Sequence, residues 1–497
     1  MFYKSTRNSN LKVTSAQAIS QGISEDGGLF VPESIPSLTL EEVEKIGKMS
    51  YSERAAYVFT KFLTDFTEAE IRYCTDNAYS TKNFETENIA EIAHLFDGTY
   101  MLELWHGPTC AFKDMALQIL PYFLTTSAKK LNIDKKIVIL VATSGDTGKA
   151  ALEGFKDVKG TEIMVFYPDE GVSDMQKLQM VTTGGENTYV AGIRGNFDDA
   201  QSAVKQIFTD PDVAAALREK GYVMSSANSI NWGRLLPQIA YYFSAYADLL
   251  GSEEIEKGDK VNFCVPTGNF GNILAGYYAY RMGLPVGKLV CASNINNVLT
   301  DFFTTGKYDL SRVFHKTISP SMDILISSNL ERLIFEITGR DDAKVRGLMS
   351  DLKEKGEYVI DLSLLHKEFS VFDAGYAGEE ETMETIYNTF DEYGYLVDPH
   401  TAVAVSVYNN YFATTEDETP CVVLSTASPY KFAADVYEAV GESRVEDPFK
   451  AVKKLHFLTG MEVPEGIERL ETMEVRFKDV LDRTEIKGKV LGKVTEK

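Results

Sequence analysis

Lys113 has the setting in this sequence that most directly suggests chemistry. It lies in the stretch 106–121, HGPTCAFKDMALQILP, beside an apolar face whose residues recur at helical spacing: Phe112, Met115, Ala116 and Ile119. An ammonium group next to such a face is costly unless it is paired or used chemically. A desolvated lysine has a lowered pKa and is a nucleophile toward carbonyl groups.

The residues around Lys113 predict a short helix. A Gly-Pro pair interrupts the preceding segment, because proline lacks an N–H donor and disfavours helix in the residue before it. Thr109 is then expected to cap the helix, and Pro121 to mark an end or a kink. The local sequence alone favours a simpler interpretation, in which Lys113 is a surface lysine beside Asp114. Other loops in the chain reverse this preference.

A glycine-rich loop separates the predicted strand 261–265 from the predicted helix 273–280. Its residues are Gly268, Asn269, Phe270, Gly271 and Asn272. Glycines let successive backbone N–H groups point inward, and a helix N-terminus adds partial positive charge, so this loop is expected to bind a phosphate. It is not GxGxxG, and GxxxxGK[ST] is absent from the chain, so dinucleotide and P-loop sites lose support. The glycines could also serve only tight packing, and the loop alone leaves both interpretations open.

A second loop, TSGDTG, has the same placement between a strand and a helix. Ser144, Asp146 and Thr147 are its candidate substrate-binding residues. Asp146 is unexpected there, because a carboxylate repels a phosphate unless it contacts a cation. Two such loops at strand ends of one sheet indicate the crevice in which α/β proteins bind ligands.

Two further segments add polar groups. Residues 225–234 gather amides, hydroxyls and a guanidinium, so Asn231 and Arg234 are candidates for substrate binding, although Asn and Ser also build turns. Thr426 ends another predicted strand, where its hydroxyl could meet a ring nitrogen. Together with Lys113 these loops suit a phosphorylated carbonyl cofactor such as pyridoxal phosphate.

Strand and helix patterns alternate from about residue 97. Apolar, β-branched runs predict strands at 137–142, 162–167, 187–193, 261–265, 289–292 and 421–425, with helices at 149–155, 200–208 and 273–280. The alternation predicts an α/β fold with parallel sheets and helices on both faces. By contrast, residues 1–95 indicate a mainly helical unit, and 310–390 is charged and helix-favouring, as in a helical insertion. The tail from residue 485 is expected to be loosely held.

The charge balance restricts the possible partners. Of the 497 residues, 73 are Asp or Glu and 50 are Lys or Arg, which gives a formal net charge of −23. Such a surface repels polyphosphates, so neither nucleic acid nor an anionic membrane is an expected partner. A small anionic substrate would need a local cluster of donors.

Cysteine and histidine usage points to no structural metal and no disulfide framework. The five cysteines and six histidines are scattered, without a CxxC pair or metal-ligand spacing. No stretch approaches the length of a transmembrane helix, and the start, MFYKSTRNSN, lacks the apolar core of a signal peptide. A cytoplasmic protein is therefore expected.

Four motifs, in the order HGPTCAFKD, TSGDTGKAA, PTGNFGNILAG and STASPYKF, resemble those of threonine synthases, a family of fold-type II pyridoxal-phosphate enzymes. The early EDGGLFVPE resembles the N-terminal domain of their long microbial and fungal form. The resemblance spans nearly the whole chain and implies a tryptophan synthase β-like fold. It implies an N-terminal domain at 1–95, a two-lobed cofactor-binding core at 96–309, the insertion at 310–390, and a return to the core with the tail at 391–497. One departure is Ser428, where the family often has histidine.

The resemblance also implies a role for each motif. Lys113 would bind pyridoxal phosphate as a Schiff base, the loop 268–272 would hold the cofactor phosphate, and Thr426 would face the pyridine nitrogen. The loop 144–147 would lie against the ring and the substrate. The implied reaction converts O-phospho-L-homoserine and water into L-threonine and phosphate, with the freed lysine as base at Cα. A monomer or a homodimer is expected.

Other functions stay open at this point. Another fold-type II enzyme, such as a serine or threonine dehydratase or a cysteine synthase, would share the core but lack the DGGLF-type N-terminal unit and the helical insertion. A catalytically silent homologue that only binds the cofactor is opposed by the intact Lys113 and the unbroken glycine loop. A phosphate-binding NTPase is a distant alternative, because its motif is absent.

Overall fold

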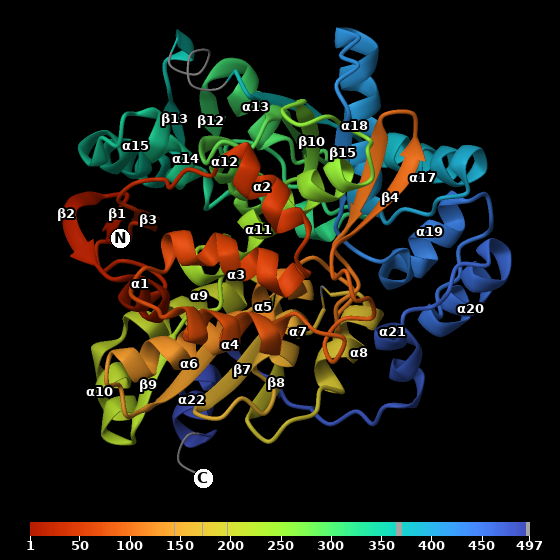
Figure 1. The fold of residues 1–497 in the computed structure, drawn as a ribbon. Coiled ribbons are helices and arrows are strands. Elements are labelled where there is room, and N and C mark those ends of the chain that lie inside the picture. The colour runs from red at the N-terminus through yellow and green to blue at the C-terminus, as the bar shows by residue number, and fades with distance from the viewer. Residues whose placement is uncertain (144, 171, 196, 364–369, 494–497) are drawn as a thin grey trace.

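Two mainly parallel sheets, one in each of two lobes, form the framework of the protein (Figure 1). The computed structural model describes residues 1–143, 145–170, 172–195, 197–363 and 370–493. Within these ranges the strands also form two small antiparallel sheets. The predicted α/β class with parallel sheets and many helices is confirmed.

The sheet of the upper lobe in Figure 1 contains six strands among the described residues. In spatial order they are β14 (Phe372–Tyr376), β11 (Val286–Ser293), β10 (Val261–Pro266), β15 (Cys421–Ser425), β5 (Thr99–Glu103) and β4 (Glu91–Phe96). Neighbours are parallel except for β4, which is antiparallel to β5. Alternate residues of a strand face opposite sides. Phe263 therefore packs with α11 (Trp232–Gly251), whereas Cys264 faces α18 (Pro399–Thr415).

The sheet of the lower lobe contains five parallel strands within the described ranges. In spatial order they are β16 (Val480–Leu481), β8 (Thr188–Ile193), β7 (Thr161–Pro168), β6 (Lys136–Ala142) and β9 (Tyr222–Ser225). One face carries α6 (Leu120–Lys130), α7 (Asp146–Phe155) and α8 (Asp174–Val181); the other carries α9 (Phe197–Thr209), α10 (Pro211–Glu219) and α22 (Ile486–Lys493). Ile139 and Val138 belong to these two different cores, so the β-branched run predicted as a buried strand is covered on both faces.

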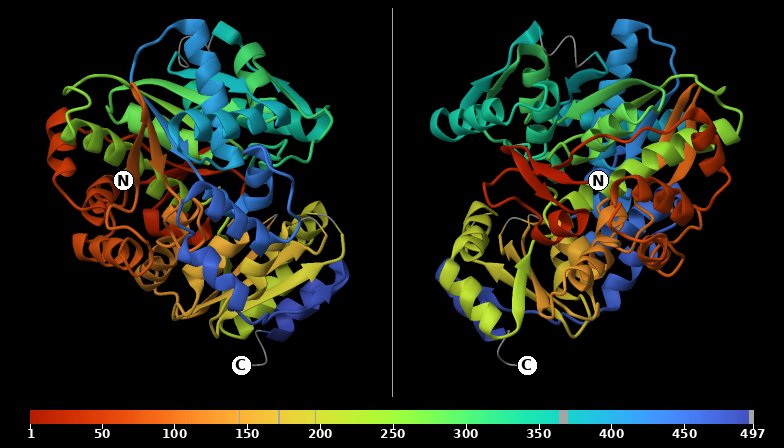
Figure 2. Two further views of the ribbon diagram at one scale, coloured as in Figure 1. Left: turned by 90° about the vertical axis from the view of Figure 1, so that its right-hand side faces the viewer. Right: turned by 60° about the vertical axis from the view of Figure 1, so that its left-hand side comes forward.

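The N-terminal unit lies against α11, beside both lobes (Figure 2). Its helices are α1 (Ser15–Gln21), α2 (Leu40–Gly47), α3 (Tyr51–Phe62) and α4 (Glu68–Ala78). Thr39, Ser50 and Thr67 start the last three with capping boxes, in which side chain and backbone satisfy each other's donors. The unit also holds a small sheet of β1 (Tyr3–Ser5), β2 (Asn8–Val13) and β3 (Phe30–Pro32), which the helical prediction did not include. β1 and β3 have only three residues each and β2 is mostly polar, so none of the three shows a clear alternation.

The structure adds two details to the expected domain division. β4 pairs with β5, so residues 91–95 of the expected N-terminal unit lie in the six-stranded sheet. The segment 310–390 contains the helices α14 (Leu330–Ile337), α15 (Asp342–Lys355) and α17 (Glu379–Tyr393), together with β13 (Glu357–Val359) and the edge strand β14. The expected helical insertion therefore also contains two short strands. The sequence of β14, FDAGY, lacks β-branched residues, which hid its pairing with β11.

Between β11 and this segment the chain forms α13 (Val298–Thr305) and β12 (Lys307–Asp309), and β12 pairs with β13. After β15 the chain passes through η2 (Pro429–Phe432), α19 (Ala433–Ala439), α20 (Pro448–Thr459), α21 (Glu465–Glu468), η3 (Arg469–Thr472) and η4 (Arg483–Glu485). It thereby crosses from the upper to the lower lobe, where β16 joins β8 (Figure 1).

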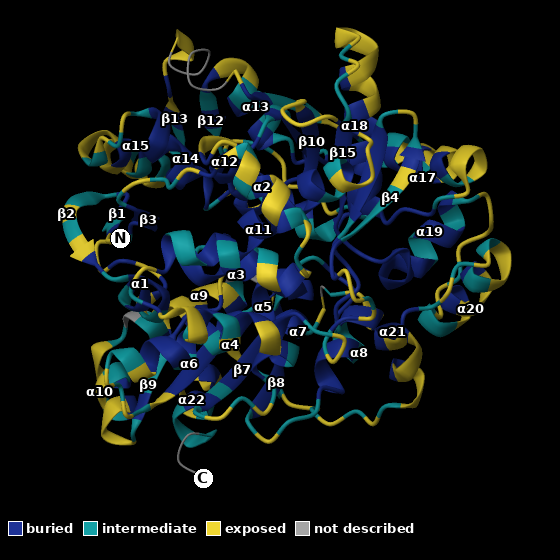
Figure 3. Ribbon diagram, viewed as in Figure 1, coloured by how far each residue is buried: buried dark blue, intermediate teal, exposed yellow. Residues whose placement is uncertain are grey.

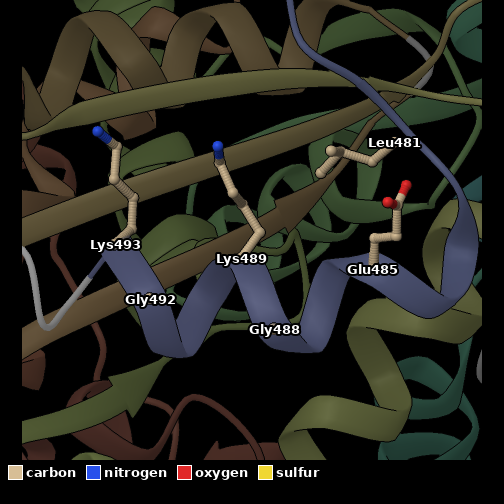
Figure 4. Close-up of a pocket in the computed structure, with 6 residues that line it drawn as sticks. All are labelled: Leu481, Glu485, Gly488, Lys489, Gly492 and Lys493. Atoms are coloured by element: carbon tan, nitrogen blue, oxygen red, sulfur yellow. The ribbon is translucent and has the colours of Figure 1, made fainter.

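The tail is held more firmly than the sequence suggested. Ile486 and Val490 of α22 are fully buried, because they extend the core of the lower lobe. A cavity of about 320 Å³ lies along this helix and is lined by Lys489 and Lys493 among others. Figure 4 shows both lysine side chains projecting from the same side of the helix. Both amines lie over the ring of Tyr189, and Lys489 Nζ is 2.9 Å from Asp479 Oδ2. These contacts serve to attach the helix. No helix in the described part of the chain is long and apolar enough to span a membrane.

Candidate active site

Lys113 immediately precedes the short helix α5 (Asp114–Leu117), in the loop that follows β5. Thr109 does not cap this helix as expected. Its backbone N–H donates to Asp114 Oδ2 at 2.8 Å, and its hydroxyl donates to Oδ1 at 2.9 Å. Burial raises the pKa of Asp114 to about 7, although these hydrogen bonds oppose the rise. Asp114 is thus used in shaping the turn and is not the charge neighbour of Lys113.

The Lys113 amine lies inside the protein, with 11% of its side chain exposed. Its Nζ donates to Ser321 Oγ at 3.2 Å and lies 3.6 Å from Asp146 Oδ2. Burial lowers the pKa of Lys113, and the charges of Lys431 and Arg234 lower it further, although Asp146 opposes them. The surface-lysine interpretation is therefore wrong, and the lowered pKa favours the neutral, nucleophilic amine.

Asp146, whose position in the sequence was puzzling, lies between two lysines. Lys431 Nζ is 2.8 Å from its Oδ1, and Gln176 donates to the same oxygen at 3.0 Å. Ser321 Oγ donates to Oδ2 at 3.2 Å, next to Lys113. Burial alone would raise the pKa of Asp146, but the two lysines hold it well below its usual range. Asp146 therefore compensates buried ammonium groups, which answers the objection that a carboxylate here would repel a phosphate.

Thr426 meets the Lys113 loop through the backbone. The Phe112 N–H donates to the Thr426 carbonyl at 2.8 Å, and Ala111 forms a β-bridge with Ala427. Ser428, the departure from the family pattern, is fully buried; its N–H donates to the Cys110 carbonyl at 3.1 Å, and its hydroxyl accepts from Tyr430 N–H at 3.4 Å. Ser428 thus joins the two loops and caps η2.

The glycine loop has the predicted place between β10 and α12 (Gly271–Arg281). Phe270 adopts a left-handed conformation, with φ of 62°. The Gly268 carbonyl accepts from Ser327 Oγ at 2.6 Å, and the Asn269 carbonyl accepts from the Asn329 N–H at 3.1 Å. The backbone N–H groups of 268–272 have no acceptor among the described residues.

Asn272, the last residue of this loop, adds a further free donor. Its Oδ1 accepts from Tyr241 and Tyr242 at 2.5 and 2.9 Å, whereas its buried Nδ2 has no partner in the described part of the chain. A set of N–H donors without acceptors at a helix N-terminus fits a phosphate group. These residues therefore fit the phosphate of pyridoxal phosphate.

We expect the Gly271→Asp variant to bind pyridoxal phosphate about tenfold to a hundredfold more weakly than the parent, by loss of charge-assisted bonds and repulsion of the phosphate. A Cβ at Gly271 would lie 3.4 Å from Asn329 Nδ2, an ordinary contact, whereas one at Gly268 would lie 2.7 Å from the Ser321 carbonyl. Gly271 is therefore the cleaner site. A carboxylate at a helix N-terminus interacts favourably with the helix dipole, and thermal unfolding of the variant checks that it is folded. Titration of the apo-protein gives the dissociation constants, with Gly271→Ala as control; equal affinities of the two variants would exclude this loop.

The two candidates in 225–234 have different places. Asn231 is fully buried and caps α11; its amide donates to the carbonyls of Ile19 and Ser226, and its oxygen accepts from Gly233 N–H. Its side chain is thus used within the fold, and substrate binding by Asn231 stays a prediction. The signal was ambiguous because the same residue types cap helices and bind ligands.

Arg234 differs from Asn231 because it lacks a partner of opposite charge. It is 3% exposed, its Nη1 donates to the Ala227 carbonyl at 3.0 Å, and its buried Nε has no acceptor among the described residues. No carboxylate among the described residues forms an ion pair with Arg234. Burial lowers its pKa to about 10, so Arg234 stays charged at neutral pH. An unpaired buried guanidinium that electrostatically affects Lys113 indicates an anion-binding position.

Of the TSGDTG candidates, Thr147 is half-buried in the first turn of α7, beside Asp146. Ser144 lies outside the described residues. Three other cations that could have bound a phosphate are engaged elsewhere: Lys149 with Glu153, Lys177 with Asp169, and Arg194 with Asp482. Ser321, Gln176 and Lys431 were not predicted as site residues, although Lys431 lies within the STASPYKF motif.

The two-lobed fold, the buried lysine and the facing glycine loop define a pyridoxal-phosphate enzyme of the α/β type. In agreement, residues 97–427 match the family "Pyridoxal-phosphate dependent enzyme". Residues 2–79 match "Threonine synthase N terminus", and residues 401–490 match "Threonine synthase, C-terminal". The chain belongs to the threonine synthase family.

Individual relatives agree with this assignment. Threonine synthase of Pseudomonas aeruginosa is 38% identical over 88% of this chain and 90% of its own length. A crystal structure of pyridoxal-phosphate-bound threonine synthase from Brucella melitensis superposes with a TM-score of 0.88 at 37% identity, covering 99% of each chain. The human protein "Threonine synthase-like 1" is 41% identical over 86% of this chain, but the match spans only 58% of that longer protein.

Proposed function

We propose that this chain is a threonine synthase, which converts O-phospho-L-homoserine and water into L-threonine and phosphate. Family membership supports the reaction class. The observation that carries the choice of substrate is Arg234, a buried cation without a carboxylate partner near Lys113. In a protein with a net charge of −23, such a group suits a substrate that brings its own phosphate.

The residues that would hold the cofactor are Lys113 as the covalent attachment, the N–H groups of 268–272 around the phosphate, and Thr426 at the pyridine nitrogen. The support is the free donors of the loop and the backbone contact between Phe112 and Thr426. When bound, pyridoxal phosphate withdraws electrons from the substrate Cα and so makes loss of its proton feasible.

The protein's own groups then place the proton. Lys113, with its lowered pKa, is the base that takes the proton from Cα onto Nζ. Ser321 and Asp146 fix the direction of that amine through contacts of 3.2 and 3.6 Å. Arg234 would bind the substrate phosphate and orient the carbon chain, and Thr147, next to Asp146 in α7, would be a neutral donor to the substrate. Loss of a second proton, from Cβ, allows the phosphate to leave Cγ. A proton added at Cγ, water added at Cβ and a proton returned to Cα then complete the conversion to L-threonine.

The competing functions are less well supported. A serine or threonine dehydratase has no phosphate on its substrate for Arg234 to bind. The match of residues 2–79 to a threonine synthase domain also favours the proposed reaction over other enzymes of the fold. A cofactor-binding protein without activity would not need the lowered pKa of Lys113.

We expect Arg234→Ala to lower kcat/KM for O-phospho-L-homoserine by about one to two decades, the loss of one charge-assisted hydrogen bond. Affinity for pyridoxal phosphate should stay within a few-fold of the parent, because the loop 268–272 is untouched. Competitive inhibition by inorganic phosphate should weaken in parallel, and Arg234→Lys should recover part of both effects. Steady-state assays on cofactor-loaded protein measure these effects. An unchanged kcat/KM in Arg234→Ala would show that Arg234 does not bind the substrate phosphate.

The proposed compartment is the cytoplasm, and the proposed assembly is a monomer or a homodimer. All five cysteines are buried and free, which suits a reducing environment. The strongly negative charge continues to argue against nucleic acid as a partner.

A further inference from the structure

Asp398 is a fully buried carboxylate at the start of α18, and both of its oxygens are used. It caps the helix by accepting from the N–H groups of His400 and Thr401. It also accepts from both of their side chains, Oδ2 from His400 Nδ1 at 2.6 Å and Oδ1 from the Thr401 hydroxyl. The N-terminal half of α18 is buried, unlike its exposed C-terminal end (Figure 3). Two branches of hydrogen bonds therefore leave one buried anion.

The first branch runs through His400 to the loop that faces Lys113. His400 Nε2 accepts from the backbone N–H of Ser321 at 3.0 Å. Because Nε2 accepts, the ring proton must be on Nδ1, where Asp398 accepts it. The same Ser321 receives the Lys113 amine on its hydroxyl at 3.2 Å. The position of Ser321, and with it the direction of the Lys113 amine, depends on the tautomer of His400.

The second branch runs through Thr401 to the other side of the site. The Thr401 hydroxyl accepts from the backbone N–H of Thr426 at 3.1 Å. The Thr426 carbonyl in turn accepts from Phe112 N–H at 2.8 Å, one residue before Lys113. Both branches start at Asp398 and end at the Lys113 loop. One passes through Ser321, and the other passes through Thr426.

We propose that Asp398, His400 and Thr401 are positioning residues that hold the Ser321 and Thr426 loops in register around Lys113. Asp398 fixes the imidazole as its Nδ1–H tautomer, and His400 then fixes Ser321. Thr401 independently fixes Thr426. None of the three needs to touch substrate. This assignment rests on the cofactor site of the proposed function, but not on the identity of the substrate.

Position 400 provides a matched pair of variants. His400→Gln keeps an acceptor near the place of Nε2, whereas His400→Phe keeps the packing against Phe432, whose ring centroid is 5.0 Å away, but removes the acceptor. The Phe variant leaves the part-buried Ser321 N–H without its acceptor. We expect this to weaken pyridoxal phosphate binding and slow borohydride fixation at Lys113 by about tenfold to a hundredfold, with little change in His400→Gln.

Asp398→Asn gives a second, isosteric test. An amide there can donate to His400 Nδ1, so the ring proton moves to Nε2. Nε2 can then no longer accept from the Ser321 N–H, because both groups are donors. The variant should then resemble His400→Phe, although it changes no volume. Thr401→Val should perturb the cofactor absorbance spectrum through Thr426, and Thr401→Ser should restore it.

The measurements are titration of apo-protein with pyridoxal phosphate, its absorbance spectrum, and the rate of borohydride fixation at Lys113. None needs a substrate, so failure of the proposed reaction is separable from failure of this proposal. Asp417→Asn is the control, because Asp417 follows α18 and bonds Asn262 and Tyr411 without reaching the site. The proposal is overturned if His400→Phe equals His400→Gln, or if Asp398→Asn and Thr401→Val both behave like Asp417→Asn. If His400→Phe fails to fold, two comparisons decide the outcome: Asp398→Asn with Asp417→Asn, and Thr401→Val with Thr401→Ser.

Discussion

The Lys113→Ala variant is expected to lose covalent cofactor attachment completely and to lose about two to four decades of turnover, the range of a missing nucleophile and base. The alanine leaves the backbone contact between Phe112 and Thr426 in place, so non-covalent cofactor binding should persist weakly. Borohydride reduction of the parent followed by peptide mapping should fix the cofactor to the peptide that contains Lys113. Labelling of another lysine would falsify the assignment.

The pH dependence of this attachment provides an additional check. Because burial holds the pKa of Lys113 below that of an ordinary lysine, near 10.4, the neutral amine is present at lower pH. The rate of cofactor attachment to apo-protein should therefore level off below pH 10.4. Lys177→Ala is a suitable control, since Lys177 pairs with Asp169 away from the site, and it should match the parent throughout.

The local features of the site could be predicted from the sequence. Lys113 beside an apolar run and a glycine loop between an apolar strand and a helix are patterns within about ten residues, and the structure places both as expected. Burial on both faces likewise explains why the central strands, such as β6, were predicted closely: they are uninterrupted apolar runs.

The partners of the site residues could not be predicted in the same way. Asp146 contacts Ser321 across 175 positions, and Lys431 contacts Thr109 across 322 positions. Periodicity shows which face of an element is buried, but not which loops meet at the ends of the strands. The network around Asp398 could not be predicted for the same reason, because the sequence DPHTA at 398–402 indicates only an ordinary helix cap.

The Asp146→Asn variant is expected to lower the free energy of unfolding by about 3–5 kcal/mol, the usual cost of removing one partner from a buried ion pair. The side chain of Lys431 is 0% exposed and lies 2.8 Å from Asp146, so the change leaves its ammonium buried without a counter-ion. Asparagine has nearly the same volume, so packing loss contributes little. Replacing Lys431 with methionine in the same variant should recover much of the loss, because a buried pair can be exchanged for apolar groups at little cost.

The pH dependence of this loss has a definite sign. Asp146 has a lowered pKa in the folded protein, so its contribution is fully present above its unfolded pKa, near 3.9, and is lost as the pH falls through the folded value. Parent and variant should therefore converge in stability only in strongly acidic solution. Asp146 also raises the pKa of Lys113, so its removal should move the pH profile of cofactor attachment to still lower pH.

The control for Asp146→Asn is a second buried pair outside the site. Glu153 lies 2.5 Å from Lys149, with exposed fractions of 6% and 3%, and Glu153→Gln should destabilise the protein through the same electrostatic mechanism. Only the Asp146 variant should change the pH profile of attachment at Lys113, because only Asp146 lies beside that amine. Thermal unfolding and borohydride fixation of both variants separate the two effects. If the two variants lose stability equally and neither alters attachment at Lys113, then Asp146 is a structural partner of Lys431 alone.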